Sequence, residues 1–372
     1  MKPARKSDLI EILAIGLLSL LASAGRLNAA QPAAAVERPR LFRLAFSGDG
    51  AHVIAAGDAI RIFDSGTGEA VERLPLARGS NTLAGFPGRD HLFAEGGESG
   101  VIRIRRVSER QPVRELKGHD GHVRNLAVSP DGKLLASVAG VLVEGRWKRT
   151  ELRLWDAGAG RLLHELDLDD RGFGCSAFSR DGKQLAVAYT SQIPDEPSRI
   201  EIYDIRGWKR VRSIAFSPGF ARSILFGGDR AEMLIVGGDC VPVNNGCQPT
   251  GRIWIAAPDA ETAQSVEQDR EYSYFLAAQT PTADRFVIGT SVVTATVNAK
   301  GKVDGARLGP LVQLRDAKTA DVVWSKITKG AGDPDGIAVS HDGKLIAALV
   351  DLTIYLFDVE AGELVREIDV KE

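Results

Sequence analysis

The sequence has little methionine and cysteine and no excess of positive charge. It holds two Met and three Cys in 372 residues, and its formal net charge is -2 at pH 7. Because a nucleic-acid-binding protein presents a basic face, this balance predicts no nucleic-acid partner. The sequence also lacks a Gly-x-Ser-x-Gly nucleophile elbow, a His-Glu-x-x-His metal motif and a glycine-rich phosphate loop. The sequence therefore contains no motif that would assign the protein to one of these catalytic classes.

Long apolar runs are also missing after the first thirty residues. Three basic residues among the first six precede the apolar run Ile12–Ala22, and the small-residue pattern Ala22–Ala24 follows. This order predicts a signal peptide over residues 1–30, cleaved near 24 or near 29/30, with an uncleaved anchor as the alternative. Residues 31–40 read as a flexible lead-in. We therefore expect a periplasmic or secreted protein that is not lipid-anchored and has no membrane span after cleavage.

The few cysteines suggest one local crosslink. Cys240 and Cys247 bracket a turn-rich run, CVPVNNGC, which favours a disulfide in an oxidising compartment. Cys175 lies in an apolar run and is expected to be a buried small hydrophobe.

Glycine, in contrast, is abundant at 40 residues, and much of it belongs to a repeat. Runs such as LAFSGDGAHVIAAG, LAVSPDGKLLASVAG and IAVSHDGKLIAALV share a Ser-x-Asp-Gly turn between apolar segments, a pattern typical of β-hairpins. Weaker copies fill the gaps and bring the number to seven. Their marker acids are Asp49, Asp90, Asp131, Asp181, Asp229, Asp284 and Asp342.

Each hairpin is followed by a third strand with apolar residues two apart, such as AIRIFD or ELRLWD, and in most copies by a fourth. Four short antiparallel strands repeated seven times predict an all-β fold, a seven-bladed β-propeller of four-stranded antiparallel blades over residues 41–370. The first and last copies each hold four strands in sequence order. We therefore expect the ring to close by packing between blades, with Leu364–Ile368 as the outer strand of the last blade.

The third copy carries a family resemblance. GHDGHVRNLAVSPDGKLLASVAG followed by ELRLWD resembles a WD40 repeat, with Gly118-His119 as the GH pair and Trp155-Asp156 as the WD pair. The resemblance implies a buried hydrogen-bond relay in which His119, Ser137 and Trp155 fill three of four roles. An insertion replaces the turn that normally holds the fourth residue, an Asp. The other six copies keep only the hairpin and the third-strand pattern.

The repeat is irregular where four consecutive copies are longer. The extra residues fall between the second and third strands, at Val141–Thr150, Thr190–Arg199, Asp239–Arg252 and Ala295–Pro310. Such connections emerge on one face of a propeller, so four long loops would form one wall there, whereas neutral drift would lengthen turns on both faces. The candidate binding residues in this wall are Arg146, Trp147, Lys148, Asp195, Glu196, Asn244, Asn245, Lys300 and Lys302.

The leading functional interpretation is a non-enzymatic module that binds a protein or peptide partner through this wall. A propeller enzyme, such as a lactonase-like hydrolase or a periplasmic dehydrogenase subunit, with a site at the central channel is the alternative. A purely structural repeat in an envelope assembly is a third interpretation. No cofactor is indicated, and His119 and His122 are too poor a set of ligands to predict a metal.

Overall fold

The structure is a computed structural model that describes residues 43–75, 80–88, 91–144, 146–169, 171–191, 196–217, 219–227, 232–243, 246–269, 276–297, 303–330 and 334–370. Its contacts divide the chain into two units, Pro39–Val292 with Leu308–Glu372 and Met1–Arg38 with Val293–Arg307. The larger unit carries the repeats and is described below. The predicted signal peptide and lead-in lie outside the described residues. Among the described residues, no helix is long and apolar enough to cross a membrane.

The described chain forms 28 strands in seven four-stranded sheets. The innermost strands are β1 (Arg43–Phe46), β5 (Ser80–Gly85), β9 (His122–Val128), β13 (Arg171–Phe178), β17 (Phe220–Phe226), β21 (Leu276–Gln279) and β25 (Gly336–Val339). The second strands are β2 (His52–Ala56), β6 (Leu92–Gly97), β10 (Leu134–Val143), β14 (Gln184–Ser191), β18 (Met233–Val243), β22 (Arg285–Val297) and β26 (Leu345–Val350).

The two outer positions complete each sheet. The third strands are β3 (Ala59–Asp64), β7 (Ile102–Arg106), β11 (Arg146–Asp156), β15 (Ser198–Asp204), β19 (Gly246–Ala256), β23 (Val303–Asp316) and β27 (Thr353–Asp358). The fourth strands are β4 (Ala70–Pro75), β8 (Arg114–Leu116), β12 (Arg161–Asp169), β16 (Lys209–Phe216), β20 (Gln264–Asp269), β24 (Val322–Ile327) and β28 (Leu364–Asp369). Blade 1 is β1–β4, and the blades are numbered onward to blade 7, which is β25–β28.

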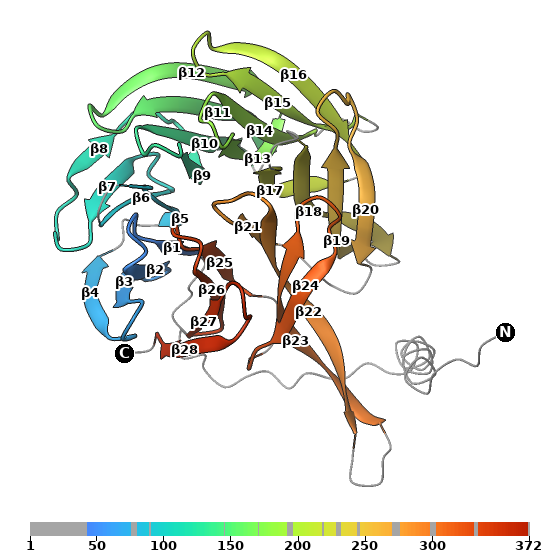
Figure 1. Cartoon of the computed structure of the whole chain (residues 1–372). Coiled ribbons are helices and arrows are strands. Elements are labelled where there is room, and N and C mark those ends of the chain that lie inside the picture. Colours follow the sequence, from blue (N-terminus) through green and yellow to red (C-terminus); the bar gives the residue numbers. More distant parts are fainter. Residues whose placement is uncertain are drawn as a thin grey trace. The chain divides into compact units, whose positions relative to one another are not determined.

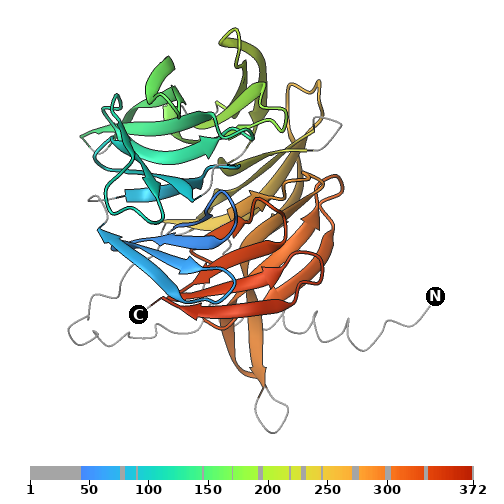
Figure 2. The same ribbon diagram turned by 60° about the vertical axis from the view of Figure 1, so that its left-hand side comes forward.

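The predicted fold is confirmed. In each sheet the four strands pair in sequence order, and every blade is contiguous in the chain. The sheets of the larger unit lie around a centre with their first strands innermost (Figure 1), and Figure 2 shows the same sheets after a turn of 60°. The expected third strands AIRIFD and TIYLFD coincide with β3 and β27.

Apolar packing between neighbouring blades forms the core. The buried apolar residues fall into seven clusters, and each cluster joins two adjacent blades. The cluster at the closing junction combines Phe46 and Phe63 of blade 1 with Leu349 and Leu356 of blade 7. Since each blade packs both its faces in this way, its inner strands are apolar on both sides, as the continuous apolar runs in the sequence predicted.

The Ser-x-Asp-Gly turns repeat one hydrogen-bond pattern. In blade 3, Ser129 Oγ donates to Asp131 at 2.7 Å, and Asp131 accepts from the Lys133 amide at 3.1 Å. Ser129 Oγ also accepts from the Leu134 amide at 2.9 Å, which starts the second strand. The turn glycines take the positive φ that this geometry requires, at Gly50 (74°), Gly132 (67°), Gly182 (67°) and Gly343 (73°).

The ring closes as expected. Blade 7 is built wholly from β25–β28, with Leu364–Ile368 inside its outer strand β28. The cluster shared by blades 1 and 7 fills the junction, and Arg366 of β28 donates a hydrogen bond to the Gly66 carbonyl of blade 1. Closure therefore uses side-chain packing and surface hydrogen bonds between two complete sheets.

Candidate functional site

The two faces of the ring differ in their turns. We call the face with the Ser-x-Asp-Gly turns the turn face, and the face with the second-to-third-strand connections the hairpin face. In blades 1, 2 and 7 these connections join strands of 5 or 6 residues. In blades 3 and 5 the corresponding strands have 10 or 11 residues. The asymmetry predicted from the spacing of the repeats is thus present in the described strands.

The extra residues form strands where the sequence analysis expected loops. In blade 3, β10 and β11 stay paired from Leu134↔Asp156 out to Val143↔Arg146, across a bulge between Val141 and Leu142. Backbone groups in an extension can pair with each other, which satisfies them without a neighbouring blade. The wall is therefore built, at least in blades 3 and 5, from protruding two-stranded hairpins.

Of the predicted binding residues, the structure describes the side chains of only Lys148 and Glu196. Lys148 is exposed on β11, and Glu196 is half-buried just before β15. Arg146 and Trp147 lie in β11 with their side chains outside the described set. Asp195, Asn244, Asn245, Lys300 and Lys302 lie outside the described residues altogether.

The tip of the blade 3 hairpin also carries apolar residues that sequence reasoning passed over. Leu142 and Val143 are 46% and 45% exposed, and the ladder sets them opposite Trp147 and Arg146. They belong to the run GVLV, whose last three residues the sequence analysis placed in the inserted loop Val141–Thr150. Exposed apolar side chains at the end of a protruding hairpin are a feature of contact surfaces.

The predicted disulfide involves the equivalent hairpin of blade 5. Cys240 lies in β18 opposite Pro249, and Cys247 lies in β19 opposite Pro242. The two cysteines are therefore diagonal neighbours on the ladder. Their side chains are outside the described set, and the disulfide stays a prediction.

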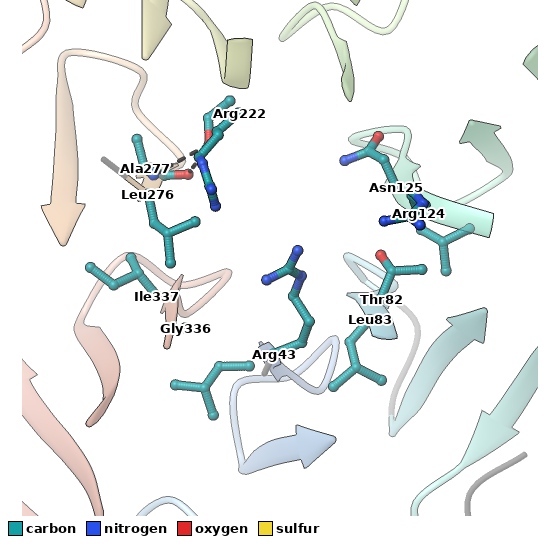
Figure 3. Close-up of a pocket in the computed structure, with 13 residues that line it drawn as sticks. Arg43, Thr82, Leu83, Arg124, Asn125, Arg222, Leu276, Ala277, Gly336 and Ile337 are labelled. Atoms are coloured by element: carbon teal, nitrogen blue, oxygen red, sulfur yellow. Dashed lines mark hydrogen bonds between the residues drawn. The ribbon is translucent and has the colours of Figure 1, made fainter. Parts of the chain in front are cut away.

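A cavity of about 220 Å³ opens where the innermost strands begin, at the centre of the hairpin face. Three arginines line it, Arg43 of blade 1, Arg124 of blade 3 and Arg222 of blade 5. Their guanidinium groups point toward the middle of the cavity (Figure 3). Burial lowers the pKa of Arg43, and the positive charges of Arg222 and Arg124 lower it further. The mouth of the channel therefore gathers cationic groups from alternate blades.

The neutral polar residues of this cavity hold adjacent blades together. Asn125 Oδ1 accepts hydrogen bonds from the Ser176 amide at 2.9 Å and from Ser176 Oγ at 2.7 Å. Ser223 Oγ donates to the Ala277 carbonyl at 3.0 Å. The convergence of Arg43, Asn125 and Arg222 depends on the ring and not on local sequence.

Blade 3 contains the relay that the resemblance implied. Trp155 Nε1 donates to Ser137 Oγ at 2.8 Å, and Ser137 Oγ lies 2.6 Å from His119 Nε2. His119 Nδ1 lies 3.0 Å from Glu151 Oε2. Because the Trp N–H can only donate, we assign the donor order Trp155 to Ser137 to His119 to Glu151, with the neutral His119 carrying its proton on Nδ1.

Glu151 fills the fourth place, where the family pattern has an Asp in a turn. It lies on β11 and is buried, and it also accepts from Arg149 Nη2 at 2.6 Å and the Asp120 amide at 3.0 Å. Burial acts to raise the pKa of Glu151, but the hydrogen bonds from His119 and Arg149 outweigh it and lower the pKa to about 2. Burial also lowers the pKa of His119, which keeps it neutral. Both ring nitrogens of His119 are thus used in hydrogen bonds within blade 3.

Comparison with known protein families finds a match that covers part of this blade. The family described as "WD domain, G-beta repeat" matches residues 110–141, which run from the end of blade 2 into β10. The chain is 27% identical over 163 residues to "p21-activated protein kinase-interacting protein 1-like" of Gallus gallus, covering 43% of this chain and 41% of that protein. It is 26% identical over 122 residues to "Guanine nucleotide-exchange factor SEC12" of Rattus norvegicus, covering 32% and 26%. The chain thus spans less than half of the length of these curated relatives.

A solved structure matches over a longer range. "Kuenenia stuttgartiensis Hydrazine Synthase" aligns with a TM-score of 0.62 over 93% of this chain and 99% of that chain, at 15% identity. At this identity the likeness concerns the fold alone. The repeat match and the seven four-stranded blades together identify the chain as a WD40-repeat-like seven-bladed β-propeller.

Proposed function

We propose that this protein is an exported interaction module that binds a protein partner through its hairpin face. The observation that carries the proposal is the one-sided extension of the second-to-third-strand hairpins, with exposed Leu142 and Val143 at the tip of the blade 3 hairpin. Apolar anchors that reach out from a rigid scaffold are suited to a partner's surface. The similarity to a protein named as kinase-interacting supports the general class of function.

The channel mouth suggests the charge of the partner. Arg43, Arg124 and Arg222 lie on the same face as the hairpins, and burial together with the positive charges of the other two disfavours the charged state of Arg43. A carboxylate inserted among them relieves this repulsion. We therefore infer that the partner places an acidic segment over the channel. Export to the periplasm or the exterior, through the apolar N-terminal segment, is part of the same proposal.

The test trims one hairpin without disturbing its blade. Replacing Leu142–Lys148 with Asn-Gly joins Val141 to Arg149, which are already paired, through a two-residue turn. Partners captured by the mature protein from its native envelope are expected to bind the trimmed variant at least about tenfold more weakly, a loss of about 1.4 kcal/mol. Binding is measured by surface plasmon resonance, and melting temperatures establish that both proteins are folded.

A matched substitution controls for the loss of exposed apolar surface. Val323 on β24 is 48% exposed, on the outer strand of blade 6. Val323→Asp is expected to leave binding unchanged, whereas Leu142→Asp weakens it. Equal binding by the trimmed variant and the unmodified protein would rule out the hairpin of blade 3 as a contact.

A propeller enzyme acting at the channel is the second candidate, and the arginine-lined cavity is the observation that favours it. Among the described residues that line this cavity there is no carboxylate and no histidine to move a proton. The lining thus supports binding of an anion better than its conversion. An activity abolished by Arg43→Ala but kept after hairpin trimming would favour the enzyme over the interaction module.

A further inference from the structure

Two of the six histidines meet at the junction of blades 1 and 2 on the turn face, far from the relay in blade 3. His52 is the first residue of β2, and His91 directly precedes β6. Asp49, from the Ser-x-Asp-Gly turn of blade 1, joins them. Each of the three offers a ligand atom, and these atoms all lie within 4.8 Å of one another.

The spacing fits a single small cation. Three ligands bound tetrahedrally to zinc at about 2.1 Å lie about 3.4 Å apart. Here His91 Nδ1 and Asp49 Oδ2 are already 3.1 Å apart. The rings of His52 and His91 meet edge to face with centroids 5.3 Å apart. Rotations that move the ligand atoms by about 1 Å therefore suffice to close the set around a metal of that size.

Two ring nitrogens in this cluster lack hydrogen bonds. His52 Nδ1 and His91 Nδ1 are both shielded from solvent and make no hydrogen bond within the described part of the chain, although His91 Nδ1 lies 3.1 Å from the Asp49 carboxylate. Such nitrogens are uncommon, because burying a polar atom without a partner is unfavourable. A metal ion accepting their lone pairs would satisfy both at once.

The backbone at His91 is a separate observation. Its φ is 60°, in the left-handed region that non-glycine residues seldom occupy. The conformation directs the His91 ring across the junction toward blade 1, where it meets Asp49 and His52. Backbone strain of this kind is found at sites where a side chain must be held in place.

We propose that Asp49, His52 and His91 form a binding site for a divalent transition metal, with zinc as the representative ion, that links blade 1 to blade 2. Two imidazoles and one carboxylate are a ligand set that zinc accepts, with a fourth position open to water. The site lies on the turn face and is independent of the partner proposed for the hairpin face. Its sequence signal is weak, because the two histidines are 39 residues apart and only the ring brings them together.

Other blades supply matched variants. The position of His52 at the start of the second strand is Leu134 in blade 3 and Leu345 in blade 7, so His52→Leu installs a residue that this fold already uses there. His91→Asn keeps a residue that tolerates positive φ. Asp131 makes the same turn contacts in blade 3 as Asp49 does in blade 1. Asp131→Asn therefore controls for the turn itself when compared with Asp49→Asn.

The experiment titrates the chelator-treated mature protein with zinc chloride by isothermal calorimetry, and with cobalt chloride by visible absorption. We expect one ion per chain and a cobalt spectrum of tetrahedral type. Each of His52→Leu, His91→Asn and Asp49→Asn should weaken zinc binding by at least about tenfold, since even outer-shell changes cost about 10- to 100-fold. Asp131→Asn should leave it unchanged, and calcium chloride should not compete.

Two results would overturn the proposal. One is the absence of stoichiometric zinc binding by the folded protein. The other is zinc binding that the three variants leave intact, which would place the ion elsewhere on the chain. The melting temperature gives a readout independent of any activity: zinc should raise it for the unmodified protein and for Asp131→Asn, but not for Asp49→Asn.

Discussion

At the scale of single residues, the relay of blade 3 shows how one carboxylate can substitute for another from a different place in the chain. Glu151 on β11 takes the role that the family gives to a turn Asp, because the turn itself has been drawn out into a long hairpin. Its side chain accepts from His119, which lies just before β9, and also from Arg149. The chemistry of the relay is conserved although its sequence position has moved.

This substitution predicts a pH-dependent stability. The folded pKa of Glu151, about 2, lies below its ordinary value of 4.5, so its contribution is complete above pH 4.5 and is lost as the pH falls toward 2. Glu151→Gln should lower the free energy of unfolding by about 1.5 to 3 kcal/mol at pH 7. The difference between the two proteins should shrink between pH 4.5 and pH 2. Urea unfolding across this range measures it.

Glu165→Gln is the control for this prediction. Glu165 lies on β12 of the same blade, is 66% exposed and approaches Arg153 at only 3.6 Å. Its loss should change the free energy of unfolding by less than about 0.5 kcal/mol. A Glu151→Gln effect that stayed constant from pH 7 to pH 2.5 would contradict the assigned role of the carboxylate.

Other blades carry different side chains at the positions of Ser137 and Trp155. In blade 2, Glu95 and Arg105 stand where blade 3 has Ser137 and Trp155, and they form a buried ion pair at 2.6 Å. In blade 4, Tyr203 takes the Trp position and its hydroxyl hydrogen-bonds to Glu201 at 2.5 Å. Sequence reasoning identified His119, Ser137 and Trp155 because a family pattern exists for them. It had no pattern for these replacements or for the Asp49, His52 and His91 cluster.

At the scale of elements, the blade 3 hairpin has an inner part that pairs with neighbouring strands and an outer part that does not. β10 pairs with β9 only as far as Gly140↔His122, and β11 pairs with β12 as far as Arg149↔Asp169. Beyond these pairs β10 and β11 have only each other. Since an isolated two-stranded ribbon is marginally stable in water, the outer part depends on whatever it contacts.

Hydrogen exchange should resolve these two parts. Amides of Leu142 to Lys148 are expected to exchange at low protection, while those of Ser137 and Leu152 exchange near the global free energy of unfolding. Mass spectrometry of peptides spanning the hairpin measures both. Binding of the proposed partner should raise the protection of the outer part alone. Uniformly high protection along the free hairpin would contradict its dependence on a partner.

The third strands and the Ser-x-Asp-Gly turns were predictable, because both depend on local chemistry. Strands such as β3 and β27 have apolar residues two apart, and the turn glycines need only their own φ. The extended hairpins were predicted as loops, because VLVEGRWKRT has no clean alternation and its pairing comes from the strand opposite. Local sequence thus located the insertion without specifying its conformation.

At the scale of the whole ring, stability is distributed over seven junctions, each with its own apolar cluster. The closing junction between blades 1 and 7 has the same kind of core as the other six. At the channel, Asn125 and Ser223 add polar contacts between adjacent blades at two of these junctions. The channel mouth and the proposed metal site both depend on residues that only the closed ring brings together, and this is why neither emerged from the sequence.

Each blade is one continuous stretch of the chain, and the order in which the blades follow one another can therefore be changed. Because each of the seven described sheets is built from one continuous stretch of the chain, a circular permutant that joins Val370 to Arg43 by a flexible linker and opens between β16 and β17 should keep all seven sheets. Its melting temperature should stay within about 5 °C of that of the original order, whereas opening between β10 and β11 should cost far more, because that cut separates paired strands within one sheet. In this protein the blade, rather than the strand, is the unit that the backbone must keep unbroken.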